Sequence, residues 1–474
     1  MDANEYCLAV DCGSTNFKMA LFNSEGVRCC DFSTPVEYAV TNNERVEFSS
    51  SSIKQNFECA VHSMQAQVVP KTVKRLALTS QAQTFTVLDE AGQPLCPFIS
   101  WLDKRAVEEA CELCQRAERK GEIHRHCSFP FVTPQMQAAK ILWLTRNEPE
   151  LIQAAARIVS LPEFLSLCFV GRGATDWNLA GMSGLFSLKN GRWWQDMLQW
   201  CGVSEDLFAP AVPVGCRMEA NSSYFTDKGS GAMAEEVIFA GNDQTAGAYG
   251  NGCSEDSVIV TLGTALVAYR YAGRQAGPYH RAGCWGPYPD GGYYELATRD
   301  EGCRALDWAV AELGLSLSDC TENAQEYAEK ILNEDVLNAC PFFMPHAIGT
   351  AEAWTGEQDV RCMCYTVFEG ISFSVRRLLQ SLSMGTETTG PVCVIGGGSR
   401  NRFWLQLIAN CLATPVFAGN GDSLSGAAAM ATGQQPVPVH GKTVEEQVQP
   451  SPDFVVLCNQ RYREWCHLIE SESM

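Results

Sequence analysis

The sequence predicts a mixed α/β protein with two domains of related design. Its 474 residues exceed what one ordinary hydrophobic core accommodates. Segments with the alternating pattern of strands take turns with segments of helical periodicity along the chain. Two short apolar hairpins of similar build, at residues 8–22 and 258–269, lie about half a chain apart. This repetition suggests a duplicated domain, in which each half offers one phosphate-binding turn to a shared cleft.

The first hairpin combines an acid, a small polar turn and a lysine. Asp11 ends its first strand, and Lys18 lies in its second strand. Its turn consists of Gly13, Ser14 and Thr15. Backbone N–H groups, hydroxyls and a lysine suit phosphate oxygens, whereas an isolated carboxylate suits Mg²⁺. The alternative is an ordinary turn that uses Asp, Gly and Ser for backbone reasons.

The segments after this hairpin alternate between predicted strands and helices. Extended structure is expected over Val27–Tyr38, Lys74–Thr79 and Thr86–Leu88, and helices over Ser51–Val68, Ala106–Arg119 and residues 134–170. Trp193, Trp194 and Trp200 are expected to lie on a helix that packs against the domain body.

A second acidic position follows the predicted domain boundary, which separates residues 1–235 from 236–474. A strand beginning at Val237 is expected to end on Gly241-Asn242-Asp243, where a helix of small residues begins. Backbone N–H groups at a helix N-terminus can hold a carboxylate in its charged form, which suits Asp243 for chemistry. A plain helix N-cap is the alternative.

The second half repeats the hairpin and adds a glycine-rich loop. The turn at Gly263 and Thr264 lacks the aspartate and the lysine of the first hairpin. A helix over Cys362–Leu382 precedes a buried strand over Pro391–Ile395 and a helix over Arg402–Ala413. The loop between the last two, residues 396–401, lets a flat or anionic ligand approach the backbone closely.

Composition limits the partners and the location. A formal net charge of −20 argues against nucleic acid and against an anionic membrane surface. The start lacks a basic and apolar export signal, so we expect a cytoplasmic location and, despite 23 cysteines, no disulfide scaffold. One cluster has residue types that could bind zinc, with buried or surface thiols as the alternative. It comprises Cys111, Cys114, His124, His126 and Cys127.

These motifs, in this order, resemble the FGGY family of carbohydrate kinases, the group that includes glycerol kinase, gluconokinase and xylulokinase. The segments 11–18 and 261–264 resemble its two phosphate motifs, 241–248 its catalytic segment and 396–401 its adenosine loop. The pattern Trp101-x-Asp103-x-Arg105 and the pair Thr175-Asp176 are further similarities. The family implies two ribonuclease-H-like domains of the actin and hexokinase type, which flank a cleft for ATP and sugar.

The resemblance also implies a role for each residue. Asp243 would be the general base that accepts the proton of a sugar or polyol hydroxyl, and Asp11 would bind the Mg²⁺ of ATP. The substrate residues would be Gln83, Trp101, Asp103, Asp243 and Gln244. The ATP residues would be Gly13, Ser14, Thr15, Lys18, Gly263, Thr264, Gly397, Gly398 and Asn401.

Departures from the family pattern leave the substrate open. Gln81-Ala82-Gln83-Thr84 matches neither the xylulokinase nor the glycerol kinase motif, although Gln83 suits the hydroxyls of a neutral polyol or ketose. No acid stands directly before Gly426-Ala427-Ala428, and Asp422 is only nearby. A non-catalytic nucleotide or sugar sensor and a sugar-independent ATPase are the alternative functions. The sugar, the phosphorylated carbon and the oligomeric state, with a homodimer among the options, are not fixed by the sequence.

Overall fold

The computed structural model divides the chain into two compact units, each assembled from separate stretches. The first comprises Met1–Gly252, Ala272–Tyr294 and Gly421–Pro436, and the second Cys253–Tyr271, Glu295–Asn420 and Val437–Met474. The residues described are 5–41, 44–67, 72–120, 123–221, 233–254, 257–274, 283–331, 340–356, 358–382, 390–438 and 447–472.

The first unit is built on a mixed sheet in which the predicted opening hairpin is central. The strand order is β14-β15-β6-β1-β2-β3. β1 pairs antiparallel with β2 and parallel with β6, and β6 pairs parallel with β15. The strands are β1 (Glu5–Cys12), β2 (Asn16–Phe22), β3 (Arg28–Pro35), β6 (Thr72–Ser80), β14 (Arg217–Glu219) and β15 (Glu236–Asn242).

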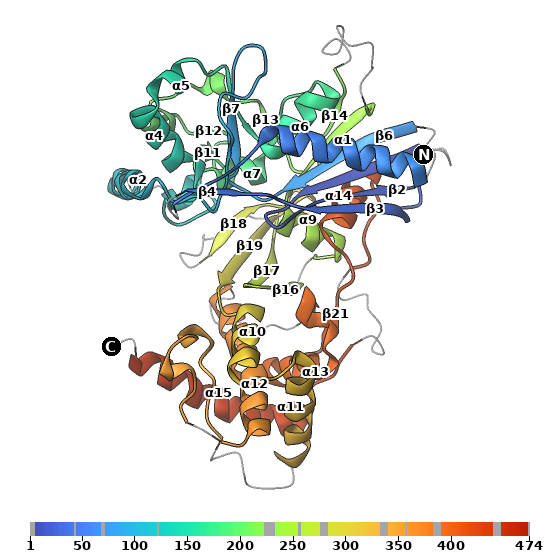
Figure 1. Cartoon of the computed structure of the whole chain (residues 1–474), viewed down its shortest axis with the longest axis vertical. Helices are drawn as coiled ribbons and strands as arrows, with labels where there is room; N and C mark the ends of the chain where they lie inside the picture. Colours follow the sequence, from blue (N-terminus) through green and yellow to red (C-terminus); the bar gives the residue numbers. More distant parts are fainter. Residues whose placement is uncertain are drawn as a thin grey trace. The chain divides into compact units, whose positions relative to one another are not determined.

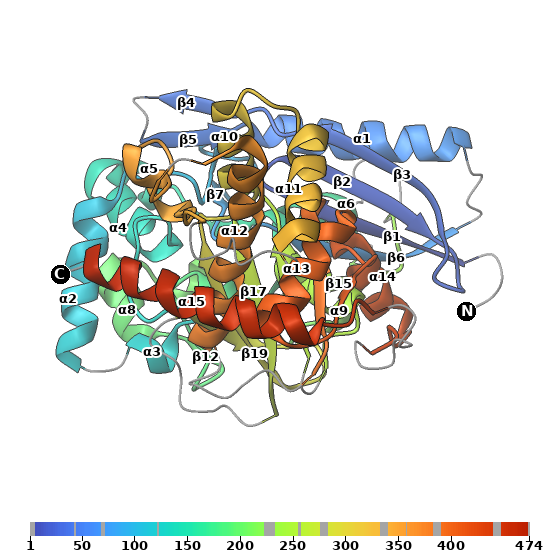
Figure 2. The same cartoon turned by 90° about the horizontal axis from the view of Figure 1, so that it is seen from below.

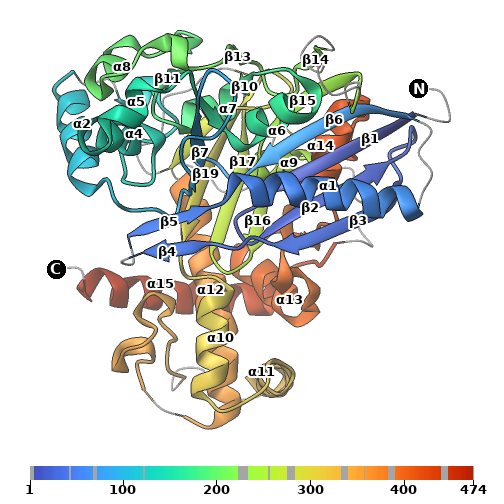
Figure 3. The same cartoon turned by 45° about the horizontal axis from the view of Figure 1, so that its top comes forward.

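Helices cover both faces of this sheet, as Figure 1 shows. α1 (Ser50–Gln67) and α6 (Leu161–Val170) lie on one face, and α9 (Asp243–Gly250) and α14 (Ser423–Thr432) on the other. Figure 3 shows α1 running across β1, β2 and β3. Side chains alternate along β1, so Leu8 and Val10 join the core under α1 while Cys7 and Ala9 join the core under α14. Asp11 continues the second series and therefore belongs to the α14 face.

A second sheet and a group of helices complete the first unit. Its strand order is β4-β5-β8-β7-β9. The strands are β4 (Ala39–Thr41), β5 (Arg45–Phe48), β7 (Phe85–Leu88), β8 (Phe98–Ile99) and β9 (Arg157–Ser160). The further helices are α2 (Val107–Lys120), α3 (Ile123–His126), α4 (Gln137–Asn147), α5 (Pro149–Gln153), α7 (Trp177–Met182) and α8 (Gln195–Cys201). The short elements are β10 (Thr175–Asp176), β11 (Phe186–Ser187), β12 (Arg192–Trp193), β13 (Ala211–Val212), β18 (Cys284–Pro287) and the 3₁₀ turn η1 (Glu205–Leu207).

Two sequence expectations for this unit were wrong. The continuous helix expected over 134–170 is interrupted by β9, because that segment pairs antiparallel with β7 and tertiary pairing overrides local helical periodicity. Of the three tryptophans expected on one helix, only Trp200 lies in α8. Trp193 lies in β12, which pairs with β11, and Trp194 precedes the helix. The helix expected at Ser51–Val68 is confirmed as α1, although Val68 lies outside the described residues.

The second unit repeats the strand plan of the first. Its sheet contains the order β19-β17-β16-β20-β21, which corresponds to β3-β2-β1-β6-β15. β16 pairs antiparallel with β17 and parallel with β20, and β20 pairs parallel with β21. The strands are β16 (Val258–Leu262), β17 (Leu266–Gly273), β19 (Tyr293–Arg299), β20 (Val392–Ile395) and β21 (Val416–Ala418). The duplication inferred from the two hairpins is therefore confirmed by the pairing of the strands.

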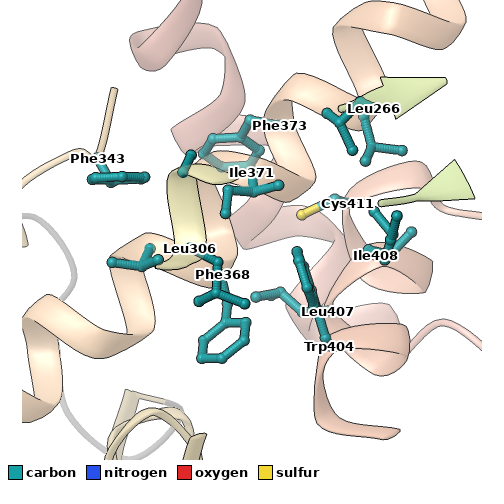
Figure 4. Packing of buried hydrophobic residues seen from close by; sticks show 14 of the residues in the cluster. Leu266, Leu306, Phe343, Phe368, Ile371, Phe373, Trp404, Leu407, Ile408 and Cys411 are labelled. Carbon is teal, nitrogen blue, oxygen red and sulfur yellow. The ribbon is translucent and has the colours of Figure 1, made fainter. Parts of the chain in front are cut away.

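Aromatic and aliphatic side chains from several helices form the core of the second unit. The helices are α10 (Cys303–Glu312), α11 (Leu317–Ile331), α12 (Val360–Leu382), α13 (Arg402–Leu412) and α15 (Pro452–Glu472), with 3₁₀ turns η4 (Pro345–Ala347), η5 (Ala351–Ala353) and η6 (Gly397–Arg400). Figure 2 shows α15 alongside α13. In Figure 4, Phe368 and Ile371 of α12 face Trp404 and Leu407 of α13. Burial of these apolar surfaces is the main stabilising contribution to the unit.

The grouping differs from the boundary expected near residue 236. The structure places β15 and α9 in the first unit, and α14 near the chain's end joins them there. The boundary as a division into functional domains stays a prediction. Among the described helices, none combines the length and the apolar character needed to cross a bilayer.

Candidate active site

The carboxylate of Asp11 is buried at the end of β1, next to the turn of the first hairpin. Its Oδ2 accepts a 2.6 Å hydrogen bond from the hydroxyl of Ser423, the first residue of α14. Its Oδ1 is buried without a hydrogen-bond partner among the described residues. A Cβ added to Gly13 would stand 2.9 Å from the carbonyl of Asn16 and 3.7 Å from this Oδ1. An oxygen that is buried and unpaired in this way fits a ligand that accepts electron density, such as a metal ion.

The carbonyl groups of the hairpin turn are all committed to the fold. Those of Cys12 and Gly13 accept hydrogen bonds from the backbone and side-chain N–H groups of Gln81, at 3.0 and 3.3 Å. Those of Ser14 and Thr15 accept from the hydroxyl of Tyr38 and from the N–H of Val36. Because a carbonyl oxygen only accepts hydrogen bonds, the N–H groups are the backbone atoms of the turn that could donate to an anion.

Asp243 stands at the junction of β15 and α9, as expected from the sequence. Asn242, and not Asp243, is the N-cap of the helix, because its side chain accepts from the N–H of Thr245 at 2.8 Å. The Asp243 carboxylate accepts a 2.9 Å bond from the N–H of Gln244 and is otherwise free of a capping duty. Asn178 of α7 fixes the junction, since it bonds both Asn242 and Thr245.

Asp11 and Asp243 influence one another electrostatically. Burial raises the pKa of Asp11 above its ordinary value, and the charge of Asp243 raises it further. Burial also raises the pKa of Asp243, while the N–H of Gln244 and the charge of Lys18 lower it. Lys18 lies directly opposite Asp11 in the β1–β2 register. The two carboxyl groups therefore titrate in dependence on one another, with Lys18 as a nearby positive charge.

Helix α9, which begins at Asp243, packs closely on α14, whose first residue bonds Asp11. A Cβ added to Gly426 would lie 1.7 Å from the carbonyl of Ala246, and one added to Gly421 would lie 2.4 Å from the carbonyl of Gly250. Glycine at these positions allows the two helices to approach closely. Asp422 caps α14 and forms an ion pair with Arg28 at 2.6 Å. The acid that the sequence placed only near this helix is thus its N-cap.

Gln83 lies in a strained and buried segment. Its φ of +65° is in the left-handed region, which non-glycine residues seldom adopt. Such strain persists where the surrounding structure imposes it, and it is concentrated at functional sites. The side chain of the following residue, Thr84, accepts a 3.1 Å bond from the N–H of Trp101. Through Thr84, the segment of Gln83 is thus bonded to that of Trp101, so two of the predicted substrate residues lie on adjoining segments. Trp101 is partly exposed.

Asp103 is fully buried and satisfied by protein donors. Arg105 donates to both of its oxygens, and the N–H of Val46 donates to Oδ2 at 2.8 Å. These bonds give Asp103 a structural role in shaping the segment that carries Trp101. Lys140 of α4, also fully buried, donates a 2.6 Å bond to the carbonyl of Ser100 in the same segment. Burial lowers the pKa of Lys140 to about 7.

In the second unit the two predicted nucleotide motifs adjoin each other. The carbonyls of Gly263 and Thr264 accept bonds from the first N–H groups of α10, so the carbonyls of this turn, like those of the first turn, are hydrogen-bonded, although to a helix N-terminus. A Cβ on Gly396 would lie 2.6 Å from the carbonyl of Leu262, whereas Gly397 faces open space. Asn401 caps α13 by accepting from the N–H of Trp404 at 3.2 Å.

The cysteine and histidine cluster has other partners in the structure. Cys111 and Cys114 lie in α2. His126 stacks on Trp194 with ring centroids 4.5 Å apart, and the thiol of Cys127 donates to the carbonyl of Gly184. Across the part of the chain that the structure describes, no group of three or more His, Cys, Asp or Glu side chains could hold a metal ion.

Comparison with known proteins identifies the family. The model of the N-terminal domain of the FGGY family of carbohydrate kinases matches residues 6–250, and that of the C-terminal domain matches 260–433. The chain belongs to the FGGY family of carbohydrate kinases. The resemblance and the fold class predicted from the sequence, two ribonuclease-H-like domains of the actin and hexokinase type, are thereby confirmed. The protein is a carbohydrate kinase enzyme.

Relatives in the FGGY family differ in the sugar that they are named for. The chain is 25% identical to an L-fuculokinase of Escherichia coli over 87% of its length and 88% of the relative. It is 24% identical to a xylulose kinase of the same organism (85% and 84%) and 21% to a gluconokinase of Bacillus subtilis (87% and 83%). A xylulose kinase structure from Rhodospirillum rubrum matches with a TM-score of 0.85 at 18% identity, covering 98% of each chain. A Plasmodium falciparum glycerol kinase structure with ADP matches with a TM-score of 0.81 at 17% identity, again over 98% of each chain.

Sequence reasoning missed three polar residues of the FGGY fold described here. Ser423 is 412 residues from Asp11, and no local pattern announces the bond between them. Lys140 and Glu163 each interrupt an apolar run, and this interruption was the available signal. An ionisable residue within a buried helical stripe needs a partner or a function, and it can be singled out on that ground.

Proposed function

We propose that this kinase transfers the γ-phosphoryl group of Mg-ATP to a hydroxyl of a small sugar or polyol, with Asp243 as the general base. The observation that carries the proposal is the partly exposed Asp243 carboxylate, which does not cap its helix and has a raised pKa. A raised pKa brings the carboxylate closer to the pH at which it must accept a proton.

The proposed reaction is an in-line displacement. The substrate oxygen forms a bond to the γ-phosphorus, the bond from that phosphorus to the leaving ADP oxygen breaks, and the hydroxyl proton passes to Asp243. Gln244, Gln83 and Trp101 would contact the substrate. Asp103 would act indirectly, through the segment that carries Trp101.

Asp11 has the properties of a magnesium ligand. Its unpaired buried Oδ1 offers a hard oxygen donor, and Mg²⁺ is usually held by one or two carboxylates together with substrate phosphates. When bound, the ion would neutralise charge on the transferring phosphoryl group. Ser423 would orient the carboxylate through its bond to Oδ2. The N–H groups of Gly13, Ser14 and Thr15, with Lys18, would bind phosphate oxygens.

The second unit would supply the remaining ATP contacts. The N–H groups at Gly263 and Thr264 would donate hydrogen bonds to phosphate oxygens, while the carbonyls of that turn accept from the first N–H groups of α10. Gly397 and Gly398, with Asn401, would border the adenosine. A cytoplasmic location and a homodimer stay predictions.

The test is sugar-dependent ADP release over a panel of polyols, ketoses and sugar acids, with Asp243→Ala as the inactive reference. We expect turnover with at least one member and loss of that turnover in the variant. ADP release that no sugar alters would favour a sugar-independent ATPase. Binding of ATP and sugar without turnover, measured by calorimetry, would favour a sensor.

A further inference from the structure

Beside Gln83 the first unit contains a small polar cavity. Its volume of about 20 Å³ accommodates roughly one water-sized group. Residues from β6–β7, α4, β9 and α6 line it with amide, hydroxyl and carboxyl groups. These are Gln81, Gln83, Thr84, Gln137, Ser160 and Glu163.

Two acceptor oxygens on this cavity lack partners. Gln81 Oε1 and Glu163 Oε1 are buried, and neither has a hydrogen bond within the described structure. Both side chains are more than nine-tenths buried, with exposures of 6% and 2%. An unpaired buried acceptor destabilises a protein by roughly 1–3 kcal/mol, so a ligand hydroxyl that donates to it gains affinity. The cavity is thus prepared for a hydrogen-bond donor.

The lining of the cavity is free of positive charge. The described residues that line it include no lysine, arginine or histidine. Arg157 of β9 acts on the Glu163 carboxyl, but its own side chain is exposed and does not line the cavity. Burial raises the pKa of Glu163 to about 8, so the carboxyl is largely protonated at neutral pH and can both donate and accept. A ligand carboxylate would find no basic side chain in the lining, whereas a hydroxyl would find partners of both kinds.

Helix α7 both lines the cavity and bonds the residue that precedes the proposed catalytic base. Leu179, Ala180 and Ser183, in or next to α7, line the cavity. Asn178 on the same helix bonds Asn242 directly before Asp243. Gln83 is both a lining residue and a predicted substrate residue.

We infer that the acceptor is an uncharged sugar or polyol, one hydroxyl of which binds in this cavity against Gln81 and Glu163, and that sugar acids are rejected. The inference rests on the proposed kinase function. In this inference Glu163 determines substrate specificity: the enzyme accepts neutral sugars and polyols and rejects aldonates, which a carbohydrate kinase could otherwise take.

The first experiment compares two sets of acceptors with the wild-type enzyme. Ketoses, aldoses and alditols form the neutral set, and the aldonates of the same carbon skeletons form the acid set. We expect the best neutral acceptor to exceed the best aldonate in kcat/KM by about 100-fold or more. An aldonate as the best substrate would overturn the inference and leave the proposed function intact. Absence of turnover with every acceptor would instead contradict the proposed function.

The second experiment tests Glu163 itself. Glu163→Leu should raise KM for the best neutral acceptor about tenfold and leave KM for ATP unchanged, whereas Glu163→Gln should stay within about threefold. Glu150→Leu, at an exposed position of α5, is the matched control. A folded Glu163→Leu protein with an unchanged sugar KM would overturn the assignment. Should this variant fail to fold, the Glu163→Gln variant and the comparison of the two acceptor sets decide.

Discussion

Ser423 donates a 2.6 Å hydrogen bond to Asp11, although 412 residues separate the two in the chain. The bond joins the first residue of α14 to the end of β1, within the first unit. Through this bond Oδ2 of Asp11 is paired, whereas its Oδ1 has no hydrogen-bond partner among the described residues. A serine near the end of the sequence therefore lowers the pKa of an aspartate near its start.

Replacing Ser423 by alanine should weaken the proposed magnesium site. The Ser423 hydroxyl lowers the pKa of Asp11, so its loss raises that pKa and favours the protonated carboxyl, which cannot bind a cation. We expect the Mg²⁺ concentration for half-maximal activity to rise about three- to tenfold, and more at pH 6.5 than at pH 8. Ser425→Ala is the matched control, because Ser425 bonds Asp422 and not Asp11. Equal Mg²⁺ dependence in both variants would refute the role of Ser423.

Replacing Asp243 by asparagine should abolish most of the catalysis while the site keeps its shape. Asparagine retains the size of the side chain but cannot accept the substrate proton, so kcat should fall by about 10²–10⁴. KM for sugar and for ATP should change little. Asp31→Asn, on the exposed side of β3, is the control. The measurement is steady-state ADP release. A kcat within tenfold of the wild-type value would show that Asp243 is not the general base.

Much of this fold was predictable because its signals are local. Apolar residues that alternate on either side of a polar turn predicted the hairpin over 8–22. The similar pattern at 258–269 predicted that the sheet is repeated. The start of α9 at Asp243 followed from a strand pattern that ends before small residues. β9 escaped prediction because it is a strand only through its pairing with β7.

For the candidate site, the sequence predicted positions in the fold, and the proposed roles stay predictions. Asp11, Gly13 and Asp243 belong to motifs that are contiguous in sequence, and the structure has Asp11 near the end of β1, Gly13 directly after that strand and Asp243 at the start of α9. Ser423 could not be foreseen, because its partner is fixed by the packing of α14 on the sheet. Asp103 was expected at the substrate, whereas its carboxylate is saturated by Arg105 and the backbone. A sequence shows that an acid is present but not how many donors surround it.

The buried Glu163 should make stability depend on pH. Its folded pKa is about 8 against an ordinary value of 4.5. Between these values the unfolded chain releases a proton that the folded protein retains, so this residue lowers the free energy of unfolding as pH rises. Glutamine does not titrate. The difference in Tm between Glu163→Gln and wild type should therefore grow in favour of the variant from pH 5 to pH 8.

Differential scanning calorimetry at several pH values measures this difference, and other titrating groups cancel in it. Glu150→Gln, which changes an exposed carboxyl, should show no such trend. A difference for Glu163→Gln that is constant between pH 5 and pH 8 would show that the residue is charged throughout this range.

Lys140 should position the segment that carries Trp101. Its ammonium group donates to the carbonyl of Ser100, and methionine at this position would keep the bulk and lose the bond. We expect Lys140→Met to raise KM for the sugar about three- to tenfold and to leave KM for ATP unchanged. Lys104→Met is the matched control, since Lys104 is an exposed residue of the same segment. A parallel increase in both KM values would indicate general loosening of the fold instead of positioning.

The contact between α9 and α14 should tolerate a methyl group at one glycine and not at another. A Cβ at Gly426 would stand 1.7 Å from the carbonyl of Ala246, so Gly426→Ala must push the helices apart. We expect the free energy of unfolding to fall by about 1–3 kcal/mol or more, with loss of activity because Ser423 and Asp243 lie on these helices.

Gly247→Ala provides the comparison on the same pair of helices. The closest atom to a Cβ at Gly247 is the backbone nitrogen of Ser423, at an ordinary contact distance of 3.8 Å. Alanine also has the higher helix propensity, by about 1 kcal/mol, so this variant should keep or gain stability. Urea unfolding of both variants measures the difference. Equal destabilisation would mean that helix packing does not depend on the close approach at Gly426, because both sites would then respond to added volume alone.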